Sequence, residues 1–236
     1  MDISTGTGMD QPSPESVPYR CVISAGPTRE YLDPFRFISN PSSGKMGYAL
    51  AEAALALGWS VDLVSGPTSL PEPSGCIFYP VVTGEEMFHQ IDALYDACDI
   101  LIMSAAVSDY RPTHYSDKKI KKEDTGMSLS LSPVIDILKT VNKRKQGQYV
   151  VGFAAETNDL EKYAWKKLKE KNLDMVVANP IGLPGSGFGG EQNELTVLFS
   201  DGRKQSLGPA DKKLLGQDLV RLLLEEVARK KDSKTI

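Results

Sequence analysis

Short runs of β-branched and apolar residues alternate along the chain with longer stretches that have helical spacing. The runs predict strands near residues 19–25, 61–65, 77–82, 100–105, 149–154 and 175–179. The stretches between them predict helices near residues 45–57, 85–97, 134–145 and 158–171. Alternating strands and helices are typical of βαβ units, in which helices cover both faces of a mostly parallel sheet. The pattern therefore predicts an α/β fold.

The end of the chain follows a different pattern. Leu195, Val197 and Phe199 alternate onto one face, and the turn signal Asp201-Gly202 follows, so a β-hairpin is predicted over about 194–207. After Pro209, leucines recur at helical spacing and predict a final helix. The complete expectation is a Rossmann-like, mostly parallel sheet with helices on both faces, followed by a C-terminal β-hairpin and helix.

Three stretches show neither periodicity: residues 26–44, 106–131 and 180–193. They are predicted to be loops without regular structure. Each follows a predicted strand, and in an open α/β sheet ligands bind beyond the carboxyl ends of the strands. Loops of this length inside a compact domain are usually functional. The pattern therefore predicts a ligand-binding site at this edge of the sheet.

Composition and charge narrow the classes of function. Charged residues make up 25% of the chain, the formal net charge is −4, and no apolar run approaches the roughly 20 residues that a membrane-spanning helix needs. Lysine and arginine are dispersed apart from short clusters, which argues against nucleic acid as a partner. Residues 1–18 lack a basic start and an apolar core, so a disordered leader is expected. We expect a cytoplasmic protein with a single domain over 19–232 that binds a small anion and no membrane.

Cysteine and histidine offer little catalytic chemistry. Cys21, Cys76 and Cys98 are far apart and lie in surroundings typical of reduced, packed thiols. His89 and His114 are too few for a histidine-rich metal site, and no Ser-His-Asp arrangement has a convincing base. Any metal is therefore expected to be held mainly by oxygen atoms, and its ligands stay unassigned.

The segment "FRFISNPSSGKMGYAL", residues 35–50, places a Gly-Lys pair at the start of a predicted helix. A Walker A loop is excluded, because Ser39 stands at the position of its first glycine and Met46 follows Lys45. The glycine-rich dinucleotide fingerprint is also absent after the first strand, where Gly26 stands alone. The segment therefore matches neither common phosphate-binding motif.

Small residues nevertheless leave backbone N–H groups accessible at this helix start. Ser42, Ser43 and Gly44 precede Lys45, and the positive end of the helix dipole favours a phosphate or carboxylate there. A plain serine cap with an exposed lysine explains the same residues. Two arginines and an asparagine crowd residues 29–40, and such groups are costly to bury without partners. The segment is therefore interpreted as an anion-binding cleft.

Several longer motifs carry a resemblance to a known family. The stretch "ISAGPTREYLDPFRFISNPSSGKMGYALAEAALALGWSVDLVSGPTSL" is followed, in order, by "SAAVSDYRP", "KKIKK", "VGFAAET" and "DMVVANP". From about residue 19 to residue 230 the chain closely resembles phosphopantothenoylcysteine synthetase in its bacterial, CTP-dependent form. The family is often the second half of a bifunctional protein whose first half is a flavin-dependent decarboxylase. A free-standing synthetase without flavin is expected, because the chain leaves no room for that half.

The resemblance implies a ligase of coenzyme A biosynthesis that joins 4′-phosphopantothenate to L-cysteine. In the first step the pantothenate carboxylate attacks the α-phosphate of CTP, which releases pyrophosphate and leaves an acyl-cytidylate. In the second step the cysteine amine attacks the acyl group and CMP leaves. Mg2+ and several cations are expected to hold the triphosphate charge. Eukaryotic relatives commonly use ATP instead of CTP.

The same resemblance assigns the nucleotide-binding residues. They are Met103, Ser104, Ala105, Ala106, Asp109, Lys119, Asp136, Phe153, Lys167 and Lys171. Phe153 is expected to pack at the cytosine, and Lys119 is expected to reach the phosphates from a mobile flap over about 112–128. Without the resemblance, residues 118–122 are typical of a solvated charge run, and the lysines of 166–171 are typical of a solvated helix face.

Catalytic roles are implied for Asn40, Arg36 and Lys119. A neutral amide at Asn40 suits the second step, because it can donate to the developing oxyanion without taking the proton of the amine. Arg36 is expected to assist the acyl-cytidylate. The phosphate of 4′-phosphopantothenate is implied to lie among Gly26, Thr28, Ser42, Ser43, Gly44 and Lys45. Without the resemblance, an asparagine before Pro41 is typical of a turn.

Two other functions remain open, and the resemblance adds a partner. An NAD(P)-dependent oxidoreductase would use a similar sheet, although the missing glycine fingerprint weakens that alternative. A nucleotide-sensing module would keep Asp109 and Phe153 but would not need Asn40.

The family also implies a homodimer, for which the hairpin 194–207 and the glycine-rich loop 182–193 are the expected interface.

Overall fold

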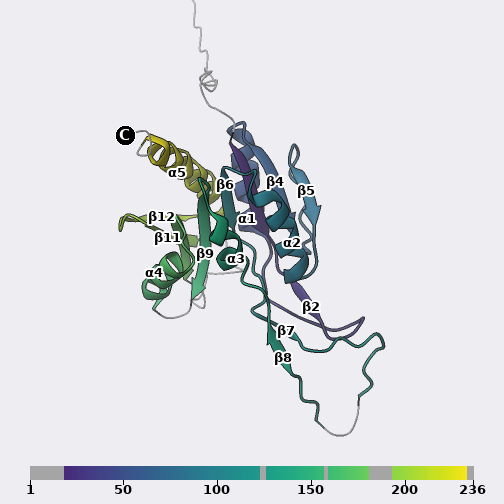
Figure 1. The fold of residues 1–236 in the computed structure, drawn as a ribbon. Helices are drawn as coiled ribbons and strands as arrows, with labels where there is room; N and C mark the ends of the chain where they lie inside the picture. Colours follow the sequence, from purple (N-terminus) through teal and green to yellow (C-terminus); the bar gives the residue numbers. More distant parts are fainter. Residues whose placement is uncertain (1–18, 123–125, 157–158, 181–192, 233–236) are drawn as a thin grey trace, which may run out of the picture.

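An eight-stranded sheet forms the centre of the molecule (Figure 1). In the computed structural model, residues 19–122, 126–156, 159–180 and 193–232 are described. The leader predicted over 1–18 and nearly all of the loop 182–193 lie outside the described residues. The strands are β1 (Arg20–Ala25), β4 (Ser60–Ser65), β5 (Ile77–Pro80), β6 (Ile100–Met103), β9 (Tyr149–Glu156), β10 (Met175–Pro180), β11 (Asn193–Phe199) and β12 (Lys204–Ala210).

The strand order defines the edge at which a ligand should bind. The order across the sheet is β12-β11-β10-β9-β6-β1-β4-β5, and the strands from β5 to β10 are parallel. The chain therefore runs outward from β1 to β4 and β5 and then returns to β6 on the other side of β1. This reversal is the topological switch point of a doubly wound sheet, where the crevice between β1 and β6 opens at their carboxyl ends.

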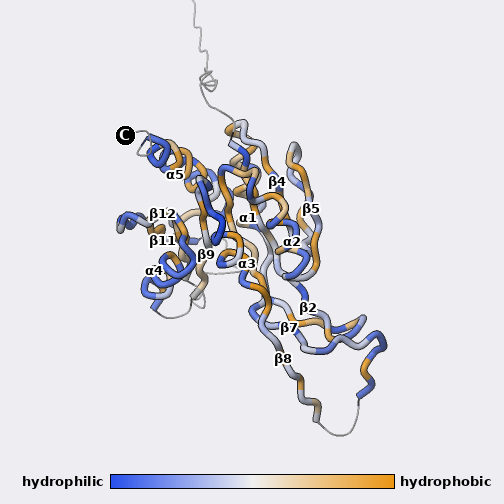
Figure 2. The backbone as a smooth tube through the Cα atoms, viewed as in Figure 1, coloured by the Kyte–Doolittle hydropathy of each residue, from blue (hydrophilic) through white to orange (hydrophobic). Residues whose placement is uncertain are grey.

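Helices cover both faces of the sheet, as predicted. One face packs against α1 (Lys45–Ala56) and α5 (Lys212–Asp232), and the other packs against α2 (Gly84–Tyr95), α3 (Ile137–Val141) and α4 (Leu160–Glu170). The strands are buried on both faces, so their sequence is almost continuously apolar: Cys21 and Ile23 face α1, whereas Val22 faces α2. Figure 2 shows hydrophobic positions along the central strands and mostly hydrophilic positions on α4.

The single helix predicted over 134–145 is wrong. The helical part is α3 alone, and a 3-10 turn at Asn142–Arg144 follows it. The Asp136 side chain accepts a hydrogen bond from the backbone N–H of Lys139, which fixes the helix start at Ile137. At the other end, the buried Asn142 amide donates to the Lys171 carbonyl and so packs against the end of α4.

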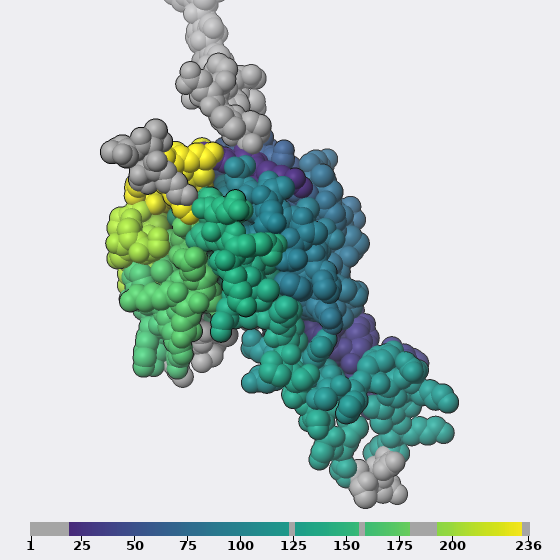
Figure 3. Space-filling model, in the orientation of Figure 1, coloured from purple at the N-terminus to yellow at the C-terminus, as the bar shows by residue number. Residues whose placement is uncertain are grey.

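Two short hairpins overturn the expectation that 26–44 and 106–131 lack regular structure. Strands β2 (Arg29–Tyr31) and β3 (Phe37–Ser39) pair with each other, and so do β7 (Tyr110–Pro112) and β8 (Leu131–Pro133). We call residues 29–39, 110–122 and 126–133 the arm, since they project together from the edge of the sheet (Figure 3). Strands of three residues are too short to show a period of two in the sequence.

The C-terminal prediction is confirmed. Strands β11 and β12 form an antiparallel hairpin with its turn at Asp201-Gly202, and β11 extends the sheet by pairing antiparallel with β10. The following helix α5 lies against α1, and both contribute to the same apolar cluster. Within the described residues, no helix combines the length and apolar character that crossing a membrane requires.

Candidate active site

The loops that leave β1 and β6 are bonded to each other at the switch point. The Ser104 hydroxyl donates to the Ser24 carbonyl at 2.6 Å, and the Ala105 N–H donates to the Ser24 hydroxyl at 3.1 Å. One turn further on, the Ser108 N–H donates to the Thr28 hydroxyl at 3.0 Å. These bonds satisfy polar groups that would otherwise be buried alone, and they hold the crevice in one shape.

Close backbone contacts bring the start of α1 over this crevice. Gly44, the residue before α1, has a φ of 75°, and a Cβ there would lie 2.7 Å from the Thr68 methyl carbon. At Gly47, a Cβ would lie 2.6 Å from the Ala25 Cβ and 2.7 Å from the Ser104 hydroxyl. Only glycine permits both approaches. The glycines thus place the first turn of α1 directly against the ends of β1 and β6.

A large cavity lies beyond the ends of β6 and β9, and we call it the main cavity. Its volume is about 810 Å³. The predicted residues that line it are Asn40, Met103, Ala105, Ala106, Asp109, Asp136, Phe153, Lys167 and Lys171. They come from the loops after β3 and β6, from the start of α3, from β9 and from α4. Segments that are distant in the sequence therefore meet around one cavity.

The two lysines of α4 are positioned by contacts on the cavity wall. The Lys167 ammonium donates to the Phe153 carbonyl, and the Lys171 ammonium lies 3.0 Å from an Asp136 carboxylate oxygen. By contrast, the Lys166 side chain is 63% exposed and pairs with Glu170 along the outer face of the helix. Residues four apart share one face of a helix, so Lys167 and Lys171 both face the cavity, whereas Lys166 faces solvent.

Asn40 enters the main cavity with a defined orientation. Its Nδ2 donates to the carbonyl oxygens of Ala106 and Val107, at 3.3 and 3.1 Å. The reversed amide would put an oxygen against two carbonyl oxygens, which cannot donate. The amide hydrogens are therefore engaged with the backbone, and the side-chain oxygen is the atom left for a ligand. This geometry differs from the expectation that Asn40 donates to an oxyanion.

A second, small cavity of about 130 Å³ lies on the α1 side of the same wall. It shares Ala105, Ala106 and Phe153 to Ala155 with the main cavity, so the two spaces adjoin across these residues. The predicted phosphate residues Ser42, Ser43, Gly44 and Lys45 line it, together with Ser104. Gly26 and Thr28 line neither cavity, and their contacts instead join the loops after β1 and β6.

Lys212 lines the small cavity as well, and the sequence reasoning missed it. It is the first residue of α5 and was assigned only to a helix that packs on the core. A lysine at a helix start is a weak signal on its own, because cations are favoured at the opposite end of a helix. Lys213, the next residue, has the same mismatch, so the sequence alone does not distinguish the two lysines.

Arg36 and Lys119 lie on the arm and do not line the cavities. The Arg36 guanidinium pairs with the Asp33 carboxylate at 2.5 Å and donates to the Ile120 carbonyl at 2.8 Å. Hydrogen bonds from Arg36 hold the pKa of the Asp33 carboxyl well below its usual range, and backbone N–H groups, including that of Ile120, add to this effect. Lys119 lies over the Phe35 ring at 5.2 Å. These contacts bring the segments that carry the two predicted catalytic cations together on the arm.

Two carboxylates that line the main cavity could bind magnesium together with the phosphates of a nucleotide. Across the described ranges, no group of three or more His, Cys, Asp and Glu residues is assembled as a metal cage. Asp109 and Asp136 both line the cavity, however. Mg2+ is usually bound through one or two carboxylates together with the phosphates of a substrate. The donor set therefore fits a magnesium ion that arrives with a nucleotide.

Comparisons with known proteins identify relatives over most of the chain. A family model described as the DNA/pantothenate metabolism flavoprotein C-terminal domain matches residues 18–227. The coenzyme A biosynthesis bifunctional protein CoaBC of Bacillus subtilis (strain 168) is 50% identical over 208 residues, which are 88% of this chain and 50% of that protein. The chain thus spans about half the length of this curated relative.

Solved structures share the fold. The crystal structure of the C-terminal domain of coenzyme A biosynthesis bifunctional protein CoaBC has a TM-score of 0.75 at 39% identity, and the match covers 88% of this chain and 96% of that one. A Cab2 mutant in complex with phosphopantothenate-cysteine has a TM-score of 0.77 and covers 92% of this chain and 89% of that one. At 16% identity the second likeness shows the fold alone.

Proposed function

The chain belongs to the DNA/pantothenate metabolism flavoprotein C-terminal domain family, and on that premise we propose that it is a ligase of coenzyme A biosynthesis that joins 4′-phosphopantothenate to L-cysteine. Its relatives include a protein described as a coenzyme A biosynthesis bifunctional protein. The nucleotide in this proposal is CTP, which is converted to CMP and pyrophosphate. A cytoplasmic location follows, because nucleoside triphosphates are made and kept there.

The reaction needs two steps because a carboxylate is a poor electrophile. First, a carboxylate oxygen of phosphopantothenate bonds to the α-phosphorus, the bond from that phosphorus to the bridging oxygen breaks, and pyrophosphate leaves. Second, the cysteine nitrogen bonds to the activated acyl carbon, the bond from that carbon to the phosphate oxygen breaks, and CMP leaves. The amine loses one proton as the amide forms. The first step requires stabilisation of phosphate charge, whereas the second requires an oriented amine.

One observation carries the proposal: eight of the ten predicted nucleotide residues line the main cavity, and four of the six predicted phosphate residues line the small cavity that adjoins it. Phosphopantothenate has a phosphate at one end and a carboxylate at the other. A molecule with its phosphate end in the small cavity would direct its carboxylate past Ala105 and Ala106 toward the main cavity. The arrangement therefore supports the encounter of an acid with a nucleotide.

The main cavity offers each part of a nucleotide a partner. Phe153 provides an aromatic side chain for a base, and Lys167 and Lys171 provide positive charge for the phosphates. Mg2+, held by Asp109 or Asp136 and the phosphate oxygens, would neutralise charge that develops on the leaving pyrophosphate. Arg36 and Lys119 would add positive charge from the arm.

Asn40 supports the second step as an acceptor. Its amide hydrogens are engaged by the carbonyls of Ala106 and Val107, so its side-chain oxygen is available to accept an N–H of the incoming cysteine amine. A hydrogen bond of this kind orients the nitrogen lone pair toward the acyl carbon. A neutral amide does this without taking the proton before the bond forms.

We also propose that the protein acts as a homodimer that forms through the arm. Phe35, Tyr115 and Met127 are 67%, 56% and 57% exposed, and all three lie on the arm. A second copy that covers these side chains would remove apolar surface from water. The edge strand β12 is less suitable, because it is largely exposed and carries lysine and proline. Sedimentation equilibrium of the wild type and of a Phe35→Glu variant tests the proposal. The wild type is expected to be a dimer at micromolar concentration and the variant a monomer. A monomeric wild type would contradict the proposal.

The alternative of an NAD(P)-dependent oxidoreductase lacks two expected features. The loop after β1 has no glycine fingerprint, and β4 ends at Ser65 rather than at an acidic residue that could bind the ribose. The site of a nicotinamide enzyme would also not require the lysines of α4.

A nucleotide panel tests the function and the cofactor together. CTP, ATP, GTP and UTP are each incubated with phosphopantothenate and Mg2+ but without cysteine, and pyrophosphate release is measured. CTP is expected to give release, and amide and CMP are expected only after cysteine is added. Quenching of NADPH fluorescence on titration, without any pyrophosphate release, would favour the oxidoreductase. A protein that binds a nucleotide but releases no pyrophosphate would instead be a sensing module.

A further inference from the structure

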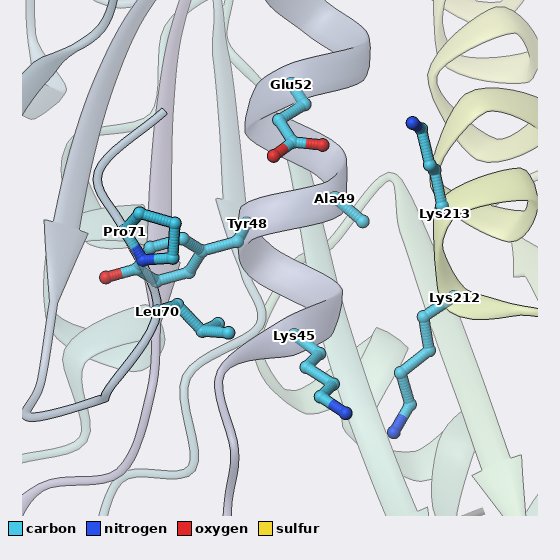
Figure 4. A pocket seen from close by; sticks show the side chains of 8 residues that line it. All are labelled: Lys45, Tyr48, Ala49, Glu52, Leu70, Pro71, Lys212 and Lys213. Carbon is cyan, nitrogen blue, oxygen red and sulfur yellow. The ribbon is translucent and has the colours of Figure 1, made fainter. Parts of the chain in front are cut away.

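Two lysines from different helices converge beside the small cavity. Lys45 is the first residue of α1 and Lys212 is the first residue of α5. Figure 4 shows both side chains extended toward the space between the two helices, whereas the neighbouring Lys213 points away from Lys45. Two ammonium groups that are brought together concentrate positive charge, which favours a bound anion beside them.

The packing of α5 on α1 fixes this convergence. Gly216 of α5 lies against Ala49 of α1, and a Cβ on Gly216 would be 3.1 Å from the Ala49 Cβ. Lys212 and Lys45 each lie four residues earlier, which is one turn of helix from the contact. The close approach of the two backbones therefore positions both lysines at the same end of the helix pair. The helix contact thus fixes the backbone positions of both lysines.

The electrostatic state of Lys212 agrees with its position. Burial lowers the pKa of the Lys212 ammonium, and the positive charge of Lys45 lowers it further. Both effects disfavour the charged form in the unliganded protein. A bound anion would oppose both, because it adds negative charge next to the ammonium and pairs with it.

The charges around the lysines indicate on which side an anion lies. On the outer side, Lys45 and Lys212 line a cavity of about 230 Å³ that also contains the carboxylate of Glu52. On the inner side they line the small cavity, where none of the described lining residues is acidic. Asn179 also lines the small cavity, and its buried side-chain oxygen has no hydrogen-bond partner within the described chain. A polar ligand on the inner side is therefore favoured.

We propose that Lys212 is a substrate-binding residue that, together with Lys45, binds the phosphate of 4′-phosphopantothenate and makes the protein select the phosphorylated acid over free pantothenate. The proposal rests on the proposed function. A phosphate monoester carries close to two negative charges at neutral pH, and the lysine pair supplies two positive charges. Free pantothenate has a neutral hydroxyl at this end and gains no such charge attraction. The pair thus favours the phosphorylated acid by attracting its phosphate, and free pantothenate receives no such attraction.

The test compares Lys212→Met with a matched control, Lys213→Met. Lys213 is the next residue on the same helix, is exposed, and lines only the outer cavity. Rates of pyrophosphate release are measured with phosphopantothenate and with pantothenate, and phosphopantothenate binding is measured by calorimetry without nucleotide. Lys212→Arg tests rescue by charge, and Lys212→Gln replaces Lys212→Met if the methionine disturbs folding.

For Lys212→Met we expect the KM for phosphopantothenate and its calorimetric Kd to rise about 10- to 100-fold, the range for loss of a hydrogen bond between charged groups. The KM for CTP and the use of pantothenate should stay unchanged, so selectivity falls by the same factor. Lys213→Met should match the wild type, and Lys212→Arg should recover most of the affinity. An unchanged selectivity in Lys212→Met and Lys212→Gln, with an active wild type, overturns the inference alone. A wild type that releases no pyrophosphate with any nucleotide overturns the proposed function instead.

Discussion

Substitution of Asn40 by aspartate separates the two steps of the proposed reaction. The two side chains have the same shape, but aspartate replaces the Nδ2 donor by a carboxylate oxygen. That oxygen would face the carbonyls of Ala106 and Val107, with which Asn40 bonds at 3.3 and 3.1 Å. Three oxygen acceptors would then meet without a donor among them, so the side chain is expected to rotate away from its position.

The magnitude follows from the bonds that are lost. Each neutral hydrogen bond contributes about 0.5–1.5 kcal/mol, and a carboxylate without a donor adds at least a further 1 kcal/mol, so the misplacement costs about 2–4 kcal/mol. If Asn40 orients the cysteine amine, this cost falls on the second step and slows amide formation about 30- to 1,000-fold. Cytidylyl transfer uses the phosphate-binding lysines instead, and we expect it to change by less than about 10-fold.

Rapid-quench single-turnover measurements distinguish the steps. Pyrophosphate reports the first step, and CMP and amide report the second. Asn40→Asp should release pyrophosphate in a burst and accumulate the acyl-cytidylate, and Asn40→Ala should show the same order of effects without the added charge. If both products form at the wild-type rate, or if pyrophosphate release falls as much as amide formation, the reasoning about Asn40 is refuted.

Two further substitutions test how the site and the arm are held. Gly44→Ala should lower the free energy of unfolding by about 1–3 kcal/mol in urea titrations, because φ is 75° and the added Cβ would lie 2.7 Å from the Thr68 methyl carbon. Gly58→Ala is the control. Gly58 has a φ of 78° and nothing within 4 Å of an added Cβ, so this substitution should lower the free energy of unfolding by only about 1 kcal/mol. Asp33 has a lowered pKa because Arg36 bonds to it, so its contribution is present above the unfolded value of about 3.9 and is lost as pH falls below it. The difference in unfolding free energy between wild type and Asp33→Asn should therefore shrink from pH 7 to pH 3, and a constant difference would contradict this.

The layers of the fold could be predicted because they depend on local patterns. Strands buried on both faces, such as β1 and β4, produce continuous apolar runs, and the hairpin at Asp201-Gly202 has a turn sequence that few other structures accept. The motif resemblance implies that Asp109 and Phe153 bind one nucleotide, and both residues line the main cavity. Each of these features depends on residues that are close together in the sequence.

The arm and Lys212 could not be predicted for a different physical reason. The strands of the arm are three residues long and are stabilised by pairing with each other rather than by a buried face. Lys212 reaches the small cavity only because Gly216 allows α5 to approach Ala49 of α1. Neither the length of a short strand nor the meeting point of two distant helices leaves a period in the sequence.

The lysine pair also explains why the site can be ready before the substrate arrives. Burial and Lys45 lower the pKa of Lys212 in the folded protein, so the unfolded chain binds more protons between that pKa and about 10.4, and the unfolding free energy rises with pH across that window. Lys212 therefore destabilises the unliganded protein at neutral pH. The Gly216–Ala49 contact keeps both lysines in place in spite of their repulsion. A dianion that binds between them gains the attraction of two charges without first having to gather them, since the packing of two helices has already done so.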